Sequence, residues 1–187
     1  MSQPLGEIRF DTPGREVRVR PAGTSTRRLD GCFALIVVAC LGALATALTS
    51  QHRFDMDPCP WCILQRVIFL AIVLAAILGL VWRRVAGRVV SAVLVLLLAL
   101  SGMATALWQH FVAAKSSSCG LSFADRFMTA THLPTLLPSV FEPRASCADA
   151  AVNMMGIPYA LWGFGGFVCI ALVALVALVA IASARRA

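Results

Sequence analysis

Two cysteines separated by two residues stand at the start of a long apolar stretch. In Cys59-Pro60-Trp61-Cys62, the two thiols are near enough in the chain to close into a small disulfide ring and to open again. Such a ring constrains very little chain, so it contributes little to stability through loop closure. The pair therefore predicts thiol–disulfide exchange rather than a structural crosslink.

The residues around this pair favour reactive thiols. Pro60 suits the first position of a helix, which places Cys59 near the helix cap. Free amides and the positive end of the helix dipole stabilise a thiolate there, so we expect a lowered cysteine pKa at this cap. Arg66 follows Cys62 by four residues and lies on the same helix face. An arginine within an apolar span is a candidate functional residue, although snorkelling to the lipid headgroups is an equally good interpretation of its position.

The remaining five cysteines separate into two groups. Cys119 and Cys147 lie in the long polar segment at about residues 115–158. Three others lie among apolar residues, where a thiol usually acts as a small buried hydrophobe. These are Cys32, Cys40 and Cys169.

Composition and hydropathy define the elements that must position these thiols. Hydrophobic residues make up 59% of the 187 residues and charged residues 13%, against about 45–50% and about 25% in ordinary soluble domains. The mean hydropathy is +0.83. Four apolar stretches approach the roughly 20 residues that cross a bilayer as a helix. They are residues 31–50, 63–82, 89–112 and 159–182.

These stretches predict an all-α membrane protein, a four-transmembrane-helix bundle with a long periplasmic loop between the third and fourth helices. The predicted transmembrane domain covers residues 31–182. A flexible basic cytoplasmic tail is expected at residues 1–30 and a short basic one at 183–187. Within the loop, the proline-broken apolar stretch 133–141 is too short to span, and we expect it to lie in the membrane interface; an ordinary loop is the alternative.

The net charge of +7 is distributed unevenly along the chain. With four crossings, the arginine-rich segments fall on one side, and the two opposite connections carry most of the acidic residues. The positive-inside rule then places both termini in the cytoplasm and both cysteine-bearing loops on the outer side of the membrane. The basic excess is therefore a topology signal, and the pattern argues against nucleic-acid binding. The arginines concerned are Arg9, Arg15, Arg18, Arg20, Arg27, Arg28, Arg83, Arg84, Arg88, Arg185 and Arg186.

The pattern Cys59-x-x-Cys62-x-x-x-Arg66 at the start of the second of four spans resembles the disulfide bond formation protein B (DsbB) family. The second cysteine pair, in the second outer loop, adds to the resemblance, which covers residues 30–182. The lead-in to the fourth span is similar as well. It consists of Cys147-Ala148-Asp149, Met155-Gly156-Ile157-Pro158 and Trp162.

This resemblance implies a relay of thiol–disulfide exchanges that ends at a membrane quinone. A soluble periplasmic DsbA-like thiol oxidase would attack Cys119 and form a transient mixed disulfide. Cys147 would be the loop partner of Cys119 and would pass electrons to Cys59. Cys62 would face the quinone, either ubiquinone or menaquinone, as electron acceptor.

Two further residues receive an implied role near the quinone. Arg66 would draw negative charge onto a quinone oxygen, as preorganised positive charge does where anionic character develops. His110, which by itself resembles an ordinary interfacial histidine, would lie near the quinone. The sequence also departs from the family, because Gln65 stands where relatives often carry a glutamate.

Three other interpretations compete with this one. Vitamin K epoxide reductase-like proteins also combine four spans, a paired-cysteine motif and quinone, but their motif precedes the last core span. A metal-binding membrane protein would use the four outer cysteines as ligands, although the second pair lacks the tight spacing usual in such sites; no metal site is expected here. A structural membrane subunit with two disulfides is the third. Haem attachment fails because Ile63 occupies the place of the required histidine.

Overall fold

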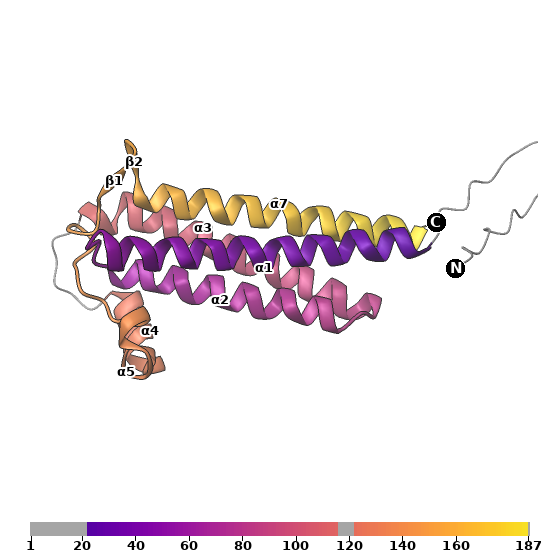
Figure 1. Ribbon diagram of the computed structural model, residues 1–187, viewed down its shortest axis with the longest axis horizontal. Coiled ribbons are helices and arrows are strands. Elements are labelled where there is room, and N and C mark those ends of the chain that lie inside the picture. The colour runs from indigo at the N-terminus through magenta and orange to yellow at the C-terminus, as the bar shows by residue number, and fades with distance from the viewer. Residues whose placement is uncertain (1–21, 116–121, 187) are drawn as a thin grey trace, which may run out of the picture.

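The computed structural model describes residues 22–115 and 122–186. Four long helices run side by side along the molecule (Figure 1). They are α1 (Ala22–Arg53), α2 (Pro60–Val81), α3 (Val85–Phe111) and α7 (Tyr159–Arg186). All four are long and apolar enough to cross a membrane. The prediction of a membrane helical bundle is thereby confirmed.

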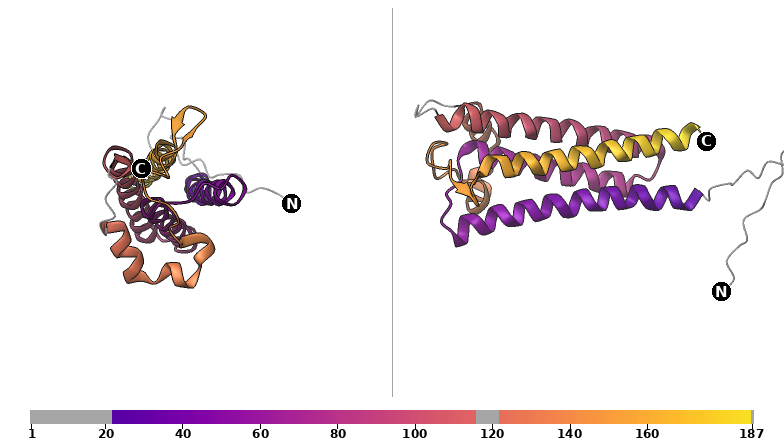
Figure 2. Two further views of the ribbon diagram at one scale, coloured as in Figure 1. Left: turned by 90° about the vertical axis from the view of Figure 1, so that its left-hand side faces the viewer. Right: turned by 90° about the horizontal axis from the view of Figure 1, so that it is seen from above.

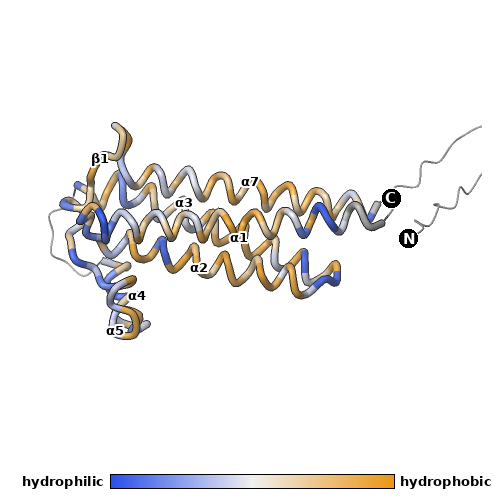
Figure 3. Tube along the Cα trace, in the orientation of Figure 1, coloured by the Kyte–Doolittle hydropathy of each residue, from blue (hydrophilic) through white to orange (hydrophobic). Residues whose placement is uncertain are grey.

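The four helices form a closed ring in which each packs against two others. The extensive contacts are α1 with α2, α2 with α3, α3 with α7, and α7 with α1. Viewed from the end that carries the short elements, the helices appear end-on around a common centre (Figure 2). Their middles are apolar and polar residues gather toward the ends (Figure 3). Outward-facing residues such as Val38, Leu97 and Val176 are exposed, as lipid contact requires.

Close approach of α3 and α7 depends on a glycine. A Cβ atom at Gly102 would lie 2.4 Å from the ring of Phe167. That ring is fully buried and stacks on Phe69 of α2 with centroids 4.2 Å apart. Because glycine leaves this space, one aromatic pair can join three helices in the centre of the bundle.

The bounds of the terminal helices differ from the expected domain limits. α1 begins at Ala22, inside the segment expected as a flexible tail over 1–30, and α7 continues to Arg186, inside the segment expected as a tail over 183–187. An ion pair between Asp30 and the buried Arg88 of α3 joins α1 to the bundle at this end. Hydropathy alone missed these turns because they are polar.

The segment between α3 and α7 holds several short elements. They are the 3₁₀ turn η1 (Ala113–Lys115), the helices α4 (Phe123–Thr131), α5 (Leu133–Leu136) and α6 (Pro138–Phe141), and the strands β1 (Asn153–Met154) and β2 (Ile157–Pro158). The two strands form an antiparallel hairpin whose turn contains Met155 and Gly156, both with positive φ. α4 packs against α2 and, with α5, extends sideways from the bundle (Figure 1).

The apolar stretch 133–141 is divided between the bundle and the surface. Leu136 and Leu137 are exposed, whereas Phe141 is buried in the main core. Two backbone carbonyls of this stretch, those of Ser139 and Val140, accept hydrogen bonds from side chains of the bundle. The stretch thus packs partly on the bundle, and its contact with the membrane interface stays a prediction.

Candidate redox site

The first turn of α2 positions the cysteine pair. Cys59 is the N-cap of α2 and Pro60 is its first residue, as the sequence predicted. The Cys62 amide donates a hydrogen bond to Cys59 Sγ at 3.3 Å, and the two sulfur atoms lie 3.0 Å apart. Cys59 has no exposed surface, while Cys62 is partly exposed and lines a cavity. The two thiols are therefore adjacent but face different surroundings.

Backbone hydrogen bonds bring Cys147 to this pair. The amides of Arg144 and Ala145 donate to the carbonyl of Pro58, at 3.0 and 3.4 Å. The segment that precedes Cys147 is thereby fastened to the residue that precedes Cys59. A side-chain hydrogen bond then joins the Cys147 and Cys59 sulfurs. Of the second predicted pair, only Cys147 can be placed, because Cys119 lies outside the described residues.

Contact between Cys59 and Cys147 determines which of these two sulfurs keeps its proton. The hydrogen bond between them raises the pKa of Cys59 and lowers the pKa of Cys147. A further hydrogen bond to Cys62 and burial raise the pKa of Cys59 as well. The expected lowering at the helix cap is therefore wrong for Cys59, because neighbouring sulfurs outweigh the helix terminus.

Arg66 is buried, with 5% of its surface exposed, and does not extend to the headgroups. Its Nη1 donates to Gln51 Oε1 of α1 at 2.7 Å and to the Val140 carbonyl of α6 at 2.8 Å. Its Nη2 donates to the Ala47 carbonyl at 3.4 Å. Among residues 22–115 and 122–186, no carboxylate forms an ion pair with Arg66. The hydrogen-bond partners of the guanidinium are neutral groups, and Arg66 brings a positive charge to the wall of the cavity.

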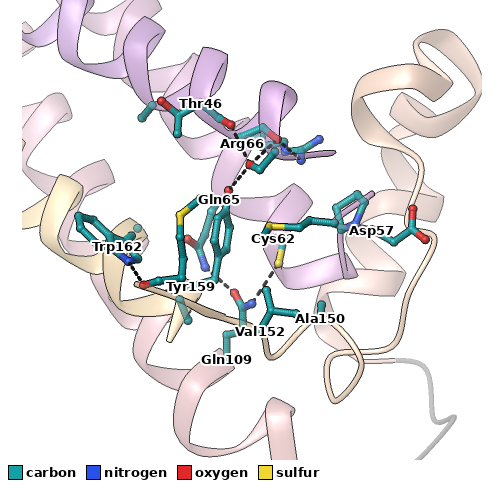
Figure 4. A pocket seen from close by; sticks show the side chains of 18 of the residues that line it. Thr46, Asp57, Cys62, Gln65, Arg66, Gln109, Ala150, Val152, Tyr159 and Trp162 are labelled. Carbon is teal, nitrogen blue, oxygen red and sulfur yellow. Dashed lines mark hydrogen bonds between the residues drawn. The ribbon is translucent and has the colours of Figure 1, made fainter. Parts of the chain in front are cut away.

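A cavity of about 780 Å³ opens beside Cys62. Its walls come from α1, α2 and α7, with Gln109 of α3 and parts of the two connecting segments (Figure 4). Most of the wall is apolar, the connecting segments contribute Asp55, Asp57 and Asp149, and the helices contribute a few polar groups. Tyr159 is one of them, and its hydroxyl lies 3.3 Å from Ser50 Oγ. The polar lining side chains in the helices are Thr46, Ser50, Gln65, Arg66, Gln109 and Tyr159.

His110 is not among the described residues that line the large cavity. It lines a separate small pocket together with Cys147. Its ring packs edge-on against Phe111, with centroids 4.8 Å apart. The structure thus brings Cys59, Cys62, Cys147 and Arg66 to one region, and His110 lines a pocket that shares lining residues with the large cavity.

Sequence reasoning missed the glutamine next to His110. Gln109 Nε2 lies 3.0 Å from Cys62 Sγ and 3.5 Å from Cys59 Sγ, and the side chain is 4% exposed. Figure 4 shows its amide between Cys62 and Gln65. One sequence signal could have identified it, because Gln109 is a polar residue in an apolar span and precedes His110 directly.

Taken together, these features define a helical membrane protein with a paired-thiol site at one end of a four-helix bundle. The family model described as disulfide bond formation protein DsbB matches residues 27–177. The chain is 34% identical over 166 residues to disulfide bond formation protein B of Aromatoleum aromaticum, covering 86% of this chain and 95% of that protein.

Two further relatives carry the same name and are similar over most of the chain. Disulfide bond formation protein B of Burkholderia pseudomallei (strain 1106a) is 32% identical over 148 residues, covering 79% of this chain and 88% of the relative. Disulfide bond formation protein B 1 of Pseudomonas savastanoi pv. phaseolicola is 32% identical over 148 residues, covering 78% and 86%. The chain belongs to the disulfide bond formation protein B family, and it is a multi-pass membrane oxidoreductase of disulfide bond formation.

Proposed function

We propose that this protein reoxidises a soluble periplasmic DsbA-like thiol oxidase and passes the electrons to membrane quinone. The observation that carries the proposal is the position of the Cys59–Cys62 pair. Cys59 contacts a cysteine of the long connecting segment, whereas Cys62 faces the large cavity. The pair thus has an electron donor on one side and room for an acceptor on the other.

The relay consists of three steps, and in each the two electrons that one partner loses are taken up by the next. First, two thiols of the partner reduce the Cys119–Cys147 disulfide through a mixed disulfide at Cys119, which leaves the partner oxidised. Next, Cys119 and Cys147 as thiols reduce the Cys59–Cys62 disulfide and become a disulfide again. Finally, the Cys59 and Cys62 thiols form their disulfide and release two electrons and two protons to the acceptor. The hydrogen bond between Cys147 and Cys59 supports the second exchange, since an exchanging thiol must reach the sulfur that it attacks.

The cavity fits a quinone headgroup as substrate. Its volume of about 780 Å³ lies in the range of small-molecule sites, and a mostly apolar wall with a few convergent polar groups is typical of them. A quinone supplies the capacity to take up two electrons and two protons.

Arg66 contributes the charge that such an acceptor requires. A buried guanidinium costs free energy in a low-dielectric interior, and this one has only neutral hydrogen-bond partners among the described residues. It therefore favours negative charge arising in the cavity as electrons leave Cys62. We keep a quinone contact of His110 as a prediction, although the side chain lies beside Cys147.

The distribution of charge supports placing the redox site in the periplasm. The start of α1, the end of α7 and the arginine-rich turn between α2 and α3 lie at the end of the bundle opposite the start of α2, where Cys59 and Cys62 lie (Figure 1). By the positive-inside rule this end faces the cytoplasm of a bacterial inner membrane. The vitamin K epoxide reductase-like alternative loses its support, because the matching family model is a different one.

The test is anaerobic mixing of the purified, fully reduced protein with a short-chain soluble quinone. We expect one quinone to be reduced for each Cys59–Cys62 pair that becomes a disulfide. The absorbance of the quinone measures its reduction. Cys62→Ser should abolish this step. Cys147→Ser should leave it intact. The free Cys119 thiol of this variant should attack the disulfide of the oxidised partner, which gives a mixed disulfide at Cys119 and a free partner thiol, and no Cys147 thiol is present to resolve it. Wild-type protein that cannot reduce quinone, or normal turnover in Cys62→Ser, would disprove the proposal.

Substitutions at Arg66 separate charge from packing. Arg66→Met keeps much of the side-chain stem and loses the charge, whereas Arg66→Lys keeps a charge without the planar fork. A charge-assisted hydrogen bond is worth about 1.5–3 kcal/mol, so Arg66→Met should slow quinone reduction roughly tenfold to hundredfold. The rate of Arg66→Lys should lie between those of Arg66→Met and the wild type. Gln51→Leu, which removes one acceptor of Arg66 but keeps its charge, should have a much smaller effect. Equal, normal kinetics in Met and Lys variants would remove Arg66 from the site.

A further inference from the structure

Two buried glutamines form a chain of hydrogen bonds that ends on the cysteine sulfurs. Gln65 belongs to the second turn of α2, and Gln109 belongs to the last turn of α3. The Nε2 group of Gln109 donates to Cys62 Sγ at 3.0 Å and to Cys59 Sγ at 3.5 Å. Both glutamines are more than nine-tenths buried. A polar donor thus contacts the reacting atoms without bringing a net charge into the membrane.

Gln65 holds the Gln109 amide in one orientation. Its Nε2 donates to Gln109 Oε1 at 2.6 Å, which occupies the oxygen and directs the NH₂ group toward the sulfurs. Figure 4 shows these groups in a row. Space for Gln65 is provided by Gly163 of α7, where a Cβ atom would lie 2.5 Å from Gln65 Oε1. Three helices therefore take part in orienting one amide.

We propose that Gln109 is a catalytic residue that stabilises the reduced, thiolate form of the Cys59–Cys62 pair, and that Gln65 is its positioning residue. The proposal deepens the proposed function, on which it rests for the use of this pair in electron transfer. A hydrogen bond to an ionised acceptor is roughly twice as strong as one between neutral groups. The sulfur of a disulfide carries no charge, so the Gln109 amide binds the reduced pair more strongly than the oxidised pair.

The consequence for the relay is a shift in the thiol–disulfide equilibrium. When the Cys59–Cys62 disulfide is reduced, its S–S bond breaks, two electrons enter the pair, and a thiolate appears where Gln109 donates. By favouring this product, Gln109 makes the disulfide a better oxidant for the thiols of Cys119 and Cys147. The same hydrogen bonds keep the Cys62 sulfur at the cavity wall.

The equilibrium is measured without quinone or partner protein. The full-length protein carrying Cys119→Ala and Cys147→Ala, so that neither loop cysteine can pair with Cys59, is equilibrated in buffers of reduced and oxidised dithiothreitol. Thiols are then alkylated and the protein is digested with trypsin. Cleavage after Arg53 and Arg66 releases one peptide that contains both cysteines, and its mass distinguishes dithiol from disulfide.

We expect Gln109→Leu to shift this equilibrium roughly tenfold toward the disulfide, the size expected for loss of a hydrogen bond to a charged group. Gln65→Met should shift it in the same direction by less, because the Gln109 amide remains but is no longer held. Added to Gln109→Leu, Gln65→Met should cause no further shift, as a double-mutant cycle requires of a residue that acts through another. Thr105→Val, which removes a hydroxyl one turn earlier on α3, should match the parent protein.

An unchanged equilibrium in a folded Gln109→Leu variant would overturn the proposal, and additive shifts in the double variant would overturn the role of Gln65. Both apolar replacements suit a membrane interior, and equal thermal unfolding in detergent checks that each variant is folded. These outcomes are independent of the proposed function. A protein that fails to reduce quinone would still report whether Gln109 favours the dithiol.

Discussion

At the scale of single residues, the site is organised by contacts between sulfur atoms. Cys59 lies between Cys62 and Cys147 and forms hydrogen bonds with both. Because the hydrogen bond between Cys59 and Cys147 raises the pKa of Cys59 and lowers the pKa of Cys147, the anionic character of this contact falls on Cys147. Such an arrangement suits a residue that exchanges electrons in two directions, since thiolates attack disulfides and thiols do not.

The pH dependence of Cys147 alkylation should report this contact. The hydrogen bond to Cys59 lowers the pKa of Cys147, so in reduced protein Cys147 should be alkylated rapidly at pH values where an ordinary thiol is protonated. Cys59→Ala removes the hydrogen bond and should move the midpoint of the rate–pH profile upward, slowing alkylation near neutral pH. Above both midpoints the rates should converge. Mass spectrometry of the Cys147 peptide measures the rate.

Cys62→Ala is the matched control for this profile, because it removes a sulfur of the same pair but leaves Cys59 beside Cys147. Its midpoint should not rise. A Cys59→Ala variant whose midpoint stayed at the wild-type value would contradict the assignment of the hydrogen bond.

At the scale of elements, the helices are held together by close packing rather than by polar links in the middle of the bundle. Helix association in a membrane lacks a large hydrophobic driving force and depends on van der Waals fit. Here Gly102 admits the Phe167 ring, which in turn stacks on Phe69. This contact lies on α3 two turns before Gln109. By packing one face of α3 against α7, it helps to determine which way the Gln109 side chain points.

Gly102→Ala should therefore lower the stability of the bundle. The added methyl would lie 2.4 Å from the buried Phe167 ring and must displace it. Overpacking of this kind costs about 1–3 kcal/mol, which should lower the unfolding temperature in detergent. Gly42→Ala on α1 is the control, since nothing lies within 4 Å of the position that its methyl group would take. Equal unfolding temperatures for the two variants would show that the contact adapts without cost.

At the scale of the whole molecule, polarity is arranged along the bundle axis. Six arginines lie near the start of α1, around the turn between α2 and α3 or near the end of α7, whereas Cys59 and Cys62 lie at the opposite end, at the start of α2 (Figure 1). They are Arg27, Arg28, Arg83, Arg84, Arg88 and Arg185. A bilayer makes flipping of such a bundle unfavourable, because the arginines would have to cross it. Orientation and the proposed function are thereby linked, since the proposed relay needs its partner on the side of the membrane that carries the thiols.

Reporter fusions test this orientation. An alkaline phosphatase, which is active only in the periplasm, should be active when inserted between Met155 and Gly156 in the exposed hairpin turn, and silent when fused after Ala187. Met155 is 89% exposed, so the hairpin should accept the insertion. A reporter that fluoresces only in the cytoplasm should give the opposite pattern at both sites. Reversal of this pattern would place the cysteines in the cytoplasm and exclude the proposed partner.

Much of the architecture follows from the sequence. Four apolar runs, each long enough to cross a bilayer, determine a helical bundle, because in lipid only helices and closed barrels satisfy their backbone hydrogen bonds. The motif Cys59-Pro60-Trp61-Cys62 marks the start of α2, since proline favours the first turn. Such local signals depend on neighbours in the chain, so a single sequence carries them.

Contacts between segments that are distant in the chain depend on the tertiary structure and could not be predicted from the sequence. Cys147 reaches Cys59 because the backbone of Arg144 and Ala145 pairs with Pro58, a contact that no local pattern encodes. Gln109 and His110 are adjacent in the chain, yet an α-helix turns about 100° per residue, 3.6 residues making one turn. The packing of α3 against α2 and α7 fixes which of the two side chains faces the sulfurs, and it selects Gln109.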